Sequence, residues 1–535
     1  MSVRRLFGLL GCLVMIVAPA LACNLPAQQP LAFPTSAGPP SPVIQPQSTA
    51  AMLAWPTPSP QVLVSPLPPQ ASPSAYGFWG LQTATPGPGQ PAAWGTPEAG
   101  AALPSFTYWT QPGDTLPALA KRFGVPEDQI VAPVSLPAAE LLPAGLQLTI
   151  PNVLGQPPYP SAALPDSLVI YSATAAEFDI QAYVAQAGGY LSTYTQELDG
   201  EVLSGAQIVR RVALETSVNP RLLLAFLEFR SGWVLGAPAD PAQVDYPIGF
   251  YVPEYRGLYL ELSLVAKQLN IGYYGWRQGT LVELVFPDGS QVRISPGVNA
   301  GTAAVQTLTS KFYRQQVDWL NALYGARGLL WVYEQLFGDP WQAAAQIEPL
   351  FPAGLAAPGL ELPFAPGERW SLTSGPHIAW TTGTPRGALD FAPITGEPAC
   401  AVSVAWVTAS APGLVVRAER GVVALDLDGD GLEQTGWVLI YMHVAAQDRV
   451  PLGTWVETDD PLGHPSCEGG RATGTHVHLA RKYNGEWVGA EGPFPLVLSG
   501  WVAHAGERLY EGTLEKDGQV VTAQPDGSYG STIVR

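Results

Sequence analysis

Five residues in the second half of the chain have the side chains and spacing of a metal-dependent site. His476 and His478 stand one residue apart in GRATGTHVHLARKYNG, in a chain of 535 residues with only 6 histidines. His377 lies in SGPHIAWTTGTPRGALDFAP, thirteen positions before Asp390, and His443 lies in LIYMHV. A catalytic zinc ion takes three protein ligands, commonly histidine nitrogens and carboxylate oxygens, and keeps a fourth position for water. These segments therefore predict a zinc site assembled from distant parts of the chain.

The two neighbouring imidazoles can have different roles, one in binding the metal and one in proton transfer. In a strand, residues i and i+2 face the same side, so His476 and His478 would face one groove while Val477 packs behind. Zinc lowers the pKa of a bound water from about 15.7 to roughly 7 and polarises a carbonyl group. A neutral imidazole beside it can accept the proton of the water and pass it to a leaving amine. One histidine would hold the metal while its neighbour moves the proton.

Short apolar runs separated by turns surround these residues. Examples are GLVVRAE, GVVALDLDGDG and GWVLIYMHV. Runs of this length, bounded by glycine and charged residues, predict an antiparallel β domain over residues 353–535. Its strands must bring the five residues to one groove.

Four segments of this domain, GPH, LDF, YMH and GTHVHLA, resemble in order the lysostaphin/beta-lytic family of zinc metallopeptidases. The wide spacing between His377 and Asp390 resembles the beta-lytic branch. The resemblance implies that His377, Asp390 and His478 bind one zinc ion. It also implies that His443 and His476 polarise the bound water and steady the tetrahedral intermediate. Family members add a tyrosine near the substrate, which no motif of this chain places.

The resemblance covers roughly residues 365 to 515, and FPLVLSGWVAHAGERLYEG is similar to the end of the beta-lytic branch. Two alternatives stay open for the histidines: they are surface or core residues, or they hold a closed, non-catalytic zinc ion. His464 and His504 are expected to lie beside the ligands or to face solvent.

A second possible cation site lies in DLDGDGLEQTGW. Asp426, Asp428 and Asp430 occupy alternate positions before Gly431, like the first half of a calcium loop. Position twelve of such a loop would be Trp437 and not glutamate, which excludes an EF-hand. A hairpin turn is the favoured interpretation, and an irregular calcium site is the alternative.

Residues 181–352 are predicted to be mainly helical, after a linker at 153–180. LSGAQIVRRVALETSVNPRLLLAFLEFRSGW predicts two helices, the first capped by Ser204 and the second opened by Asn219 and Pro220. The part SVNPRLLLAFLEFRSGW resembles the start of lysozyme-like lytic transglycosylases.

In that family a glutamate directly precedes the serine and protonates the glycosidic oxygen. Here Arg230 precedes Ser231, and arginine does not release its proton near neutrality. Glu228 lies two residues earlier, which on a helix rotates its side chain by about 200° away from that position. The region is therefore not expected to cleave glycan. It is a lysozyme-like fold used for binding or spacing, or an unrelated helical domain.

Residues 105–152 form the first predicted folded unit. A strand, a helix beginning at Asp114 or Thr115, a second helix opened by Pro126 and a closing strand give the order βααβ. With PGDTL, LAKRFGV and LPAGLQLTIP, the unit resembles a LysM module, which binds N-acetylglucosamine chains of cell walls. The alternative is a small structural domain.

The N-terminal residues have the features of an export signal. A basic start, an apolar run and ALAC resemble a bacterial lipoprotein signal over residues 1–22, with Cys23 as the lipidated mature N-terminus. Plain secretion with Cys23 lost or idle is the alternative. Residues 23–104 are rich in proline and small residues and predict a disordered linker.

Composition limits the cellular compartments and the binding partners that this protein could have. Of the four cysteines, Cys12 leaves with the signal and Cys23 is the lipid candidate, so Cys400 and Cys467 are expected to form a disulfide in an oxidising compartment. The net charge of −18 argues against a nucleic-acid partner. No second stretch is apolar and long enough to span a bilayer.

Together these features predict a multidomain, extracytoplasmic protein, lipid-anchored or secreted and associated with the cell wall. Its peptidase domain would cut peptide bonds of peptidoglycan, and its LysM-like module would bind the glycan. The rival hypothesis is a non-catalytic, wall-bound protein that binds peptidoglycan or activates a hydrolase.

Overall fold

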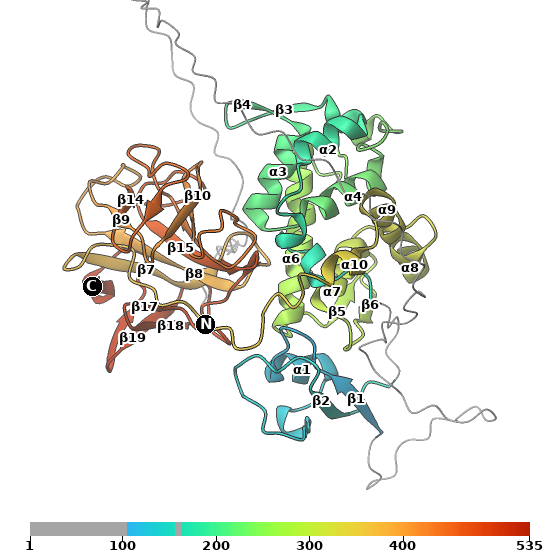
Figure 1. The fold of residues 1–535 in the computed structure, drawn as a ribbon, viewed down its shortest axis with the longest axis horizontal. Coiled ribbons are helices and arrows are strands. Elements are labelled where there is room, and N and C mark those ends of the chain that lie inside the picture. The colour runs from blue at the N-terminus through green and yellow to red at the C-terminus, as the bar shows by residue number, and fades with distance from the viewer. Residues whose placement is uncertain (1–103, 156–161) are drawn as a thin grey trace, which may run out of the picture. The chain divides into compact units, whose positions relative to one another are not determined.

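The computed structural model describes residues 104–155 and 162–535 (Figure 1). The predicted signal peptide, the lipidation of Cys23 and nearly all of the proline-rich linker lie outside the described residues. Among the residues described, no helix combines the length and the apolar character that crossing a membrane requires.

The first folded unit pairs two strands around one helix. Its elements are β1 (Ser105–Trp109), α1 (Leu116–Phe123), a 3-10 turn (Glu127–Gln129) and β2 (Gln147–Pro151). The strands are antiparallel, with Ser105 opposite Pro151. Thr115 caps α1 by accepting a hydrogen bond from the Ala118 amide, and Gly124 ends it at φ 68°.

The second helix predicted for this unit is wrong, because only the 3-10 turn follows Pro126. Val131 instead pairs with Thr149, each backbone amide donating to the other residue's carbonyl. Pro133 also follows closely and disfavours helical backbone in the residue before it. The LysM-like and lysozyme-like assignments remain predictions.

Residues 162–350 are mainly helical. The helices are α2 (Ile180–Ala187), α3 (Gly205–Thr216), α4 (Pro220–Ser231), α5 (Ala242–Asp245), α6 (Leu258–Arg277), α7 (Ala300–Ser310), α8 (Gln316–Tyr324), α9 (Leu329–Phe337) and α10 (Pro340–Ala344). Two hairpins interrupt them: β3 (Thr195–Leu198) with β4 (Glu201–Ser204), and β5 (Glu283–Val285) with β6 (Gln291–Arg293).

The predicted starts of α3 and α4 are confirmed. Ser204 and Gln207 form a reciprocal capping box at α3. The Asn219 side chain accepts from the Arg221 amide, and Pro220 occupies the first turn of α4.

A buried charge cluster ties the ends of this region together. The guanidinium of Arg277 lies 2.9 Å from Asp166, and the carboxylate of Glu348 accepts a hydrogen bond of 2.9 Å from the Ser167 amide. Burial and the charge of Asp166 raise the pKa of Glu348 from 4.5 to about 7.

We therefore expect Glu348 to make stability depend on pH. Because its folded pKa lies above its unfolded value, the folded state binds the extra proton between pH 4.5 and 7. The stabilisation is complete below pH 4.5 and is lost as pH rises through 7. A shift of this size corresponds to roughly 3 kcal/mol. Urea unfolding at pH 5 and at pH 8 measures this loss. Between these two pH values, the free energy of unfolding should fall less for Glu348→Gln than for the wild type. An exposed control, Glu334→Gln, should behave as the wild type.

The C-terminal region is an antiparallel β structure, as predicted. Nine strands form one sheet in the order β13-β10-β11-β12-β15-β8-β7-β21, with β16 paired to β15. The strands are β7 (Arg369–Ile378), β8 (Arg386–Pro393), β10 (Gly413–Glu419), β11 (Val422–Asp426), β12 (Trp437–Met442), β13 (Trp455–Val456), β15 (Val477–Tyr483), β16 (Glu486–Trp487) and β21 (Thr532–Val534).

Shorter strands complete the region. β9 (Val407–Thr408) pairs with β14 (Pro461–Gly463), and a four-stranded sheet contains β17 (Val497–Leu498), β18 (Trp501–Ala505), β19 (Gly512–Lys516) and β20 (Gln519–Thr522). The turn between β18 and β19, residues 506–511, is called the 506–511 turn below.

The two faces of the nine-stranded sheet pack differently. On one face, Leu389, Tyr441 and Leu479 are buried in the C-terminal region's own apolar core. On the other, Ala388 and Ala480 belong to the apolar core that includes the helical residues. Since side chains alternate along a strand, Asp390 and His478 lie on this second face.

Candidate metal centre

Three adjacent strands carry the predicted ligands. His478 on β15 pairs directly with Asp390 on β8, and His377 lies near the end of β7, beyond irregularities in the pairing with β8. All three residues are buried. Their donor atoms lie within 4.8 Å of one another and could hold a metal ion.

The separations of these donor atoms match a tetrahedral zinc ion. His478 Nδ1 lies 3.1 Å from Asp390 Oδ1 and 3.1 Å from His377 Nε2, and His377 Nε2 lies 3.4 Å from Asp390 Oδ1. Ligand bonds of about 2.0–2.1 Å in a tetrahedron place ligand atoms roughly 3.3 Å apart. The residues present therefore fit a zinc ion.

Backbone carbonyls determine which imidazole nitrogens carry protons. His377 Nδ1 lies 3.0 Å from the Gly375 carbonyl, and His478 Nε2 lies 3.0 Å from the Ala379 carbonyl. A carbonyl only accepts, so these two nitrogens are the N–H donors. In the neutral rings, His377 Nε2 and His478 Nδ1 then both present lone pairs, beside the Asp390 carboxylate. Three acceptors that face one another without a donor form a cation site.

The charges of the site favour a bound cation. Burial opposes ionisation of Asp390, but the neighbouring His377 and His476 outweigh it and hold the pKa of Asp390 well below its usual range. Burial lowers the pKa of His478 and keeps that imidazole neutral. Burial also acts to lower the pKa of His377, yet the Asp390 carboxylate raises it, so the site stabilises positive charge.

His443 and His476 flank the three ligands as a pair, with ring centroids 4.4 Å apart. His443 Nδ1 lies 2.8 Å from the Glu468 carbonyl, and His476 Nδ1 lies 2.7 Å from the Gly474 carbonyl. Both Nδ1 atoms therefore act as donors, and the Nε2 atoms are the ones that can carry a lone pair. Burial, then the neighbouring His476 and His478, lower the pKa of His443 to about 3. The His443 ring is therefore neutral near pH 7.

The backbone of His443 is itself unusual. Its φ is 68°, in the left-handed region that non-glycine residues rarely adopt. The Ser466 amide and hydroxyl both donate to its carbonyl, at 2.7 and 3.0 Å, and hold it there. Such strain is common at functional residues, where the surrounding structure maintains it.

A disulfide joins the two loops beside this pair. Cys400 and Cys467 are bonded, as the cysteine count predicts. Cys467 precedes Glu468, whose carbonyl accepts from His443, and the Thr475 hydroxyl donates to the Ala401 carbonyl at 2.7 Å. The disulfide therefore ties together the segments that support both histidines.

Comparison with known proteins identifies the family. Protease LasA of Pseudomonas aeruginosa is 30% identical over 367 residues, which are 64% of this chain and 79% of the protease. The chain belongs to the beta-lytic/lysostaphin-type family of zinc metallopeptidases. It is a metalloendopeptidase. The family described as LasA, N-terminal domain, matches residues 162–350.

Solved structures of this family resemble the C-terminal region only loosely. The M23 metalloprotease pseudoalterin, described as from the deep sea, is 22% identical, covers 34% of this chain and 100% of its own, and gives a TM-score of 0.27. The catalytic domain of lysostaphin from Staphylococcus simulans is 20% identical, covers 23% of this chain and 89% of its own, and gives 0.17. The assignment rests on the sequence match to the protease.

The structure also places a tyrosine at the metallopeptidase site. The ring of Tyr510, on the 506–511 turn, stacks on His377 with centroids 4.9 Å apart and planes at 29°. The Gly375 amide donates to the Tyr510 carbonyl at 2.8 Å. Tyr510 lies within the GERLYEG segment quoted above, but a lone tyrosine in a turn carries no spacing signal that singles it out.

The other two histidines do not join the ligands. His464 Nδ1 lies 2.8 Å from the Ala405 carbonyl, and its ring packs on Trp406. His504 is exposed. His504 therefore faces solvent as expected, whereas His464 is buried against a loop carbonyl and a tryptophan outside the ligand set.

The acidic segment after β11 forms a turn. The carboxylates of Asp426, Asp428 and Asp430 gather there. Asp426 accepts hydrogen bonds from the amides of Asp428 and Gly431. These bonds agree with the hairpin turn, and calcium binding stays a prediction.

The helical region of the metallopeptidase presents no acid at the expected lytic position. Arg230 donates to the Ile248 carbonyl at 2.8 Å and lies over the ring of Phe312. The Glu228 carboxylate accepts from the amides of Val234 and Leu235, beyond the end of α4. Both side chains are used in structural contacts.

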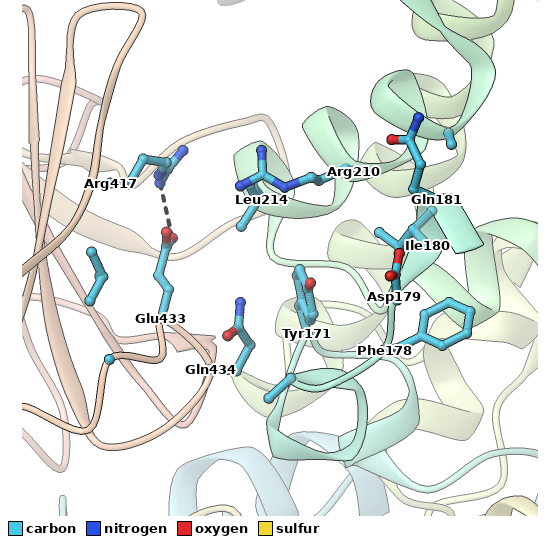
Figure 2. Close-up of a pocket in the computed structure, with 14 residues that line it drawn as sticks. Tyr171, Phe178, Asp179, Ile180, Gln181, Arg210, Leu214, Arg417, Glu433 and Gln434 are labelled. Atoms are coloured by element: carbon cyan, nitrogen blue, oxygen red, sulfur yellow. Dashed lines mark hydrogen bonds and ion pairs between the residues drawn. The ribbon is translucent and has the colours of Figure 1, made fainter. Parts of the chain in front are cut away.

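A cavity of about 330 Å³ lies apart from the histidines. Arg417, Glu433, Tyr171 and Arg210 line it (Figure 2). The Arg417 guanidinium lies 2.9 Å from the Glu433 carboxylate. Lys482 also bonds to Glu433. None of the five predicted site residues lines this cavity.

Proposed function

We propose that this metallopeptidase is an exported cell-wall hydrolase that cleaves peptide bonds of peptidoglycan, with His377, Asp390 and His478 as zinc ligands. The observation that carries the proposal is the convergence of their three lone-pair atoms in a buried site without an opposing donor. When bound there, zinc supplies a Lewis acid that activates water and polarises a carbonyl.

The residues around the ligands would handle the protons. The neutral Nε2 of His443 accepts a proton from the attacking water and then donates it to the leaving amine. His476 lies beside it, with Nε2 3.8 Å from Asp390 Oδ2, and steadies the charge that develops on the substrate. The ring of Tyr510 packs against the ligand His377.

The relatives and the rest of the chain support the proposed substrate class. A relative is described as the antimicrobial peptidase lysostaphin. The LysM-like unit would hold the enzyme on glycan, and an export signal with a lipid on Cys23 would place it outside the cytoplasm. The helical region, in this proposal, serves binding or spacing.

Digestion of purified peptidoglycan tests the proposal. The mature protein should create new amino termini, identified by mass spectrometry, and no new glycan ends. A zinc chelator should abolish these termini, and added zinc should restore them. Retained wall binding without any new ends would contradict the proposal and favour the non-catalytic hypothesis.

A further inference from the structure

We propose that Arg386 is a positioning residue, which holds the 506–511 turn and Tyr510 against the strand of His377. Arg386 is the first residue of β8 and is half-buried. The proposal rests on the function proposed above, because Tyr510 matters only if His377 lies in a catalytic site.

The guanidinium of Arg386 joins two separate segments. Its Nε donates to the Pro376 carbonyl at 3.1 Å, directly before His377. Its two terminal nitrogens donate to the carbonyls of Gly506 and Arg508, at 2.9 and 2.5 Å. One side chain therefore connects the backbone beside His377 to the turn that carries Tyr510.

Hydrogen bonds within the turn, from the Gly506 amide to the Glu511 carbonyl and from the Glu511 amide to the Arg508 carbonyl, shape it but do not attach it to β7. Its residues from Glu507 to Tyr510 are exposed, and Tyr510 itself has φ 72°, an unfavourable value for an aromatic residue. The Gly375 amide provides one hydrogen bond to it, and the turn packs directly on Gly375, where an added Cβ would lie 2.5–2.6 Å from backbone atoms of Glu511 and Gly512. An exposed turn with an unfavourable backbone needs an external anchor to keep its tyrosine in place.

Only arginine suits this anchor. Its planar guanidinium presents five N–H donors in a fixed fork, so it can serve three carbonyls of two segments at once. A lysine ammonium is a single point on a flexible stem and would bond fewer of them. The hydrogen bonds of Arg386 go to backbone carbonyls and not to the donor atoms of the three ligands, so its loss should not release zinc.

The test compares Arg386→Met and Arg386→Lys with the wild type in the full chain. Hydrogen–deuterium exchange should become at least roughly tenfold faster in peptides covering the 506–511 turn, and stay unchanged in those covering β15. Release of amino termini from peptidoglycan should fall about 10- to 100-fold for Arg386→Met and less for Arg386→Lys, at unchanged zinc content. The control Arg369→Met replaces an exposed arginine on β7 and should leave all three measurements unchanged.

A double variant separates positioning from a general structural role. If Arg386 acts through Tyr510, Arg386→Met combined with Tyr510→Ala should be no slower than Tyr510→Ala alone. Additive losses, loss of zinc, or unchanged exchange of the turn would each overturn the proposal. The exchange measurement does not need activity, so an inactive wild type would refute the proposed function while the positioning by Arg386 is still tested.

Discussion

His478→Ala should remove the bound zinc and abolish peptide-bond cleavage. The substitution deletes one of three ligands, and the remaining His377 and Asp390 would leave the ion with two. A catalytic zinc site requires three protein ligands, so we expect substoichiometric metal and a loss of activity of roughly 10³-fold or more. Metal analysis of the purified protein and digestion of peptidoglycan measure the two effects.

The control for this experiment is His504→Ala, which removes an exposed histidine outside the ligand set. It should keep one zinc ion per chain and full activity. Unfolding must be excluded as the cause of metal loss, so circular dichroism should be unchanged for both variants. One zinc ion per chain in His478→Ala would refute the ligand assignment, whatever its activity.

His443→Gln should separate metal binding from proton transfer. Glutamine keeps a polar side chain of similar reach but cannot act as a base near neutrality. Because His443 is outside the ligand set, the zinc content should stay at one ion per chain. General acid–base catalysis contributes typically 10²–10⁴-fold, and the cleavage rate should fall by about that factor.

His464→Gln is the matched control for this variant, since it replaces a buried histidine that is bonded to a backbone carbonyl away from the ligands. Its cleavage rate should stay within about twofold of the wild type, as expected for a residue that takes no part in proton transfer. A normal rate in His443→Gln would assign the base to another group, and loss of zinc would make His443 a support of the ligands.

The residues of the candidate site could be predicted from their types and their order in the sequence, but the backbone geometry around them could not. Histidine and aspartate in widely separated segments could be assigned to one metal because the segments, in order, resemble the motifs of a zinc metallopeptidase family. The alternation along a strand likewise places His476 and His478 without a structure. Neither argument predicts the irregular pairing of β7 with β8 that brings His377 to the other two ligands. Register shifts of this kind depend on packing between strands.

Two further features depend on tertiary contacts and could not be predicted. Tyr510 reaches the site only because the 506–511 turn folds back onto Gly375, which lies more than a hundred residues earlier in the chain. The sheet face bearing Asp390 is buried with helical residues, so its strands are apolar on both sides and their sequence does not distinguish the two faces. The wrong second helix near Pro126 has a similar origin, since a bridge to Thr149 overrides local propensity.

The four imidazoles at the site have one trait in common: each is hydrogen-bonded to a main-chain oxygen. Many metal sites use a carboxylate side chain for this purpose, and a point mutation can delete it. No amino-acid substitution deletes a main-chain carbonyl. The choice of which ring nitrogen donates is therefore robust to mutation of neighbouring side chains, and evolution could change it only by moving the backbone. Sequence drift around the site can alter which peptides bind while leaving the arrangement of lone pairs intact.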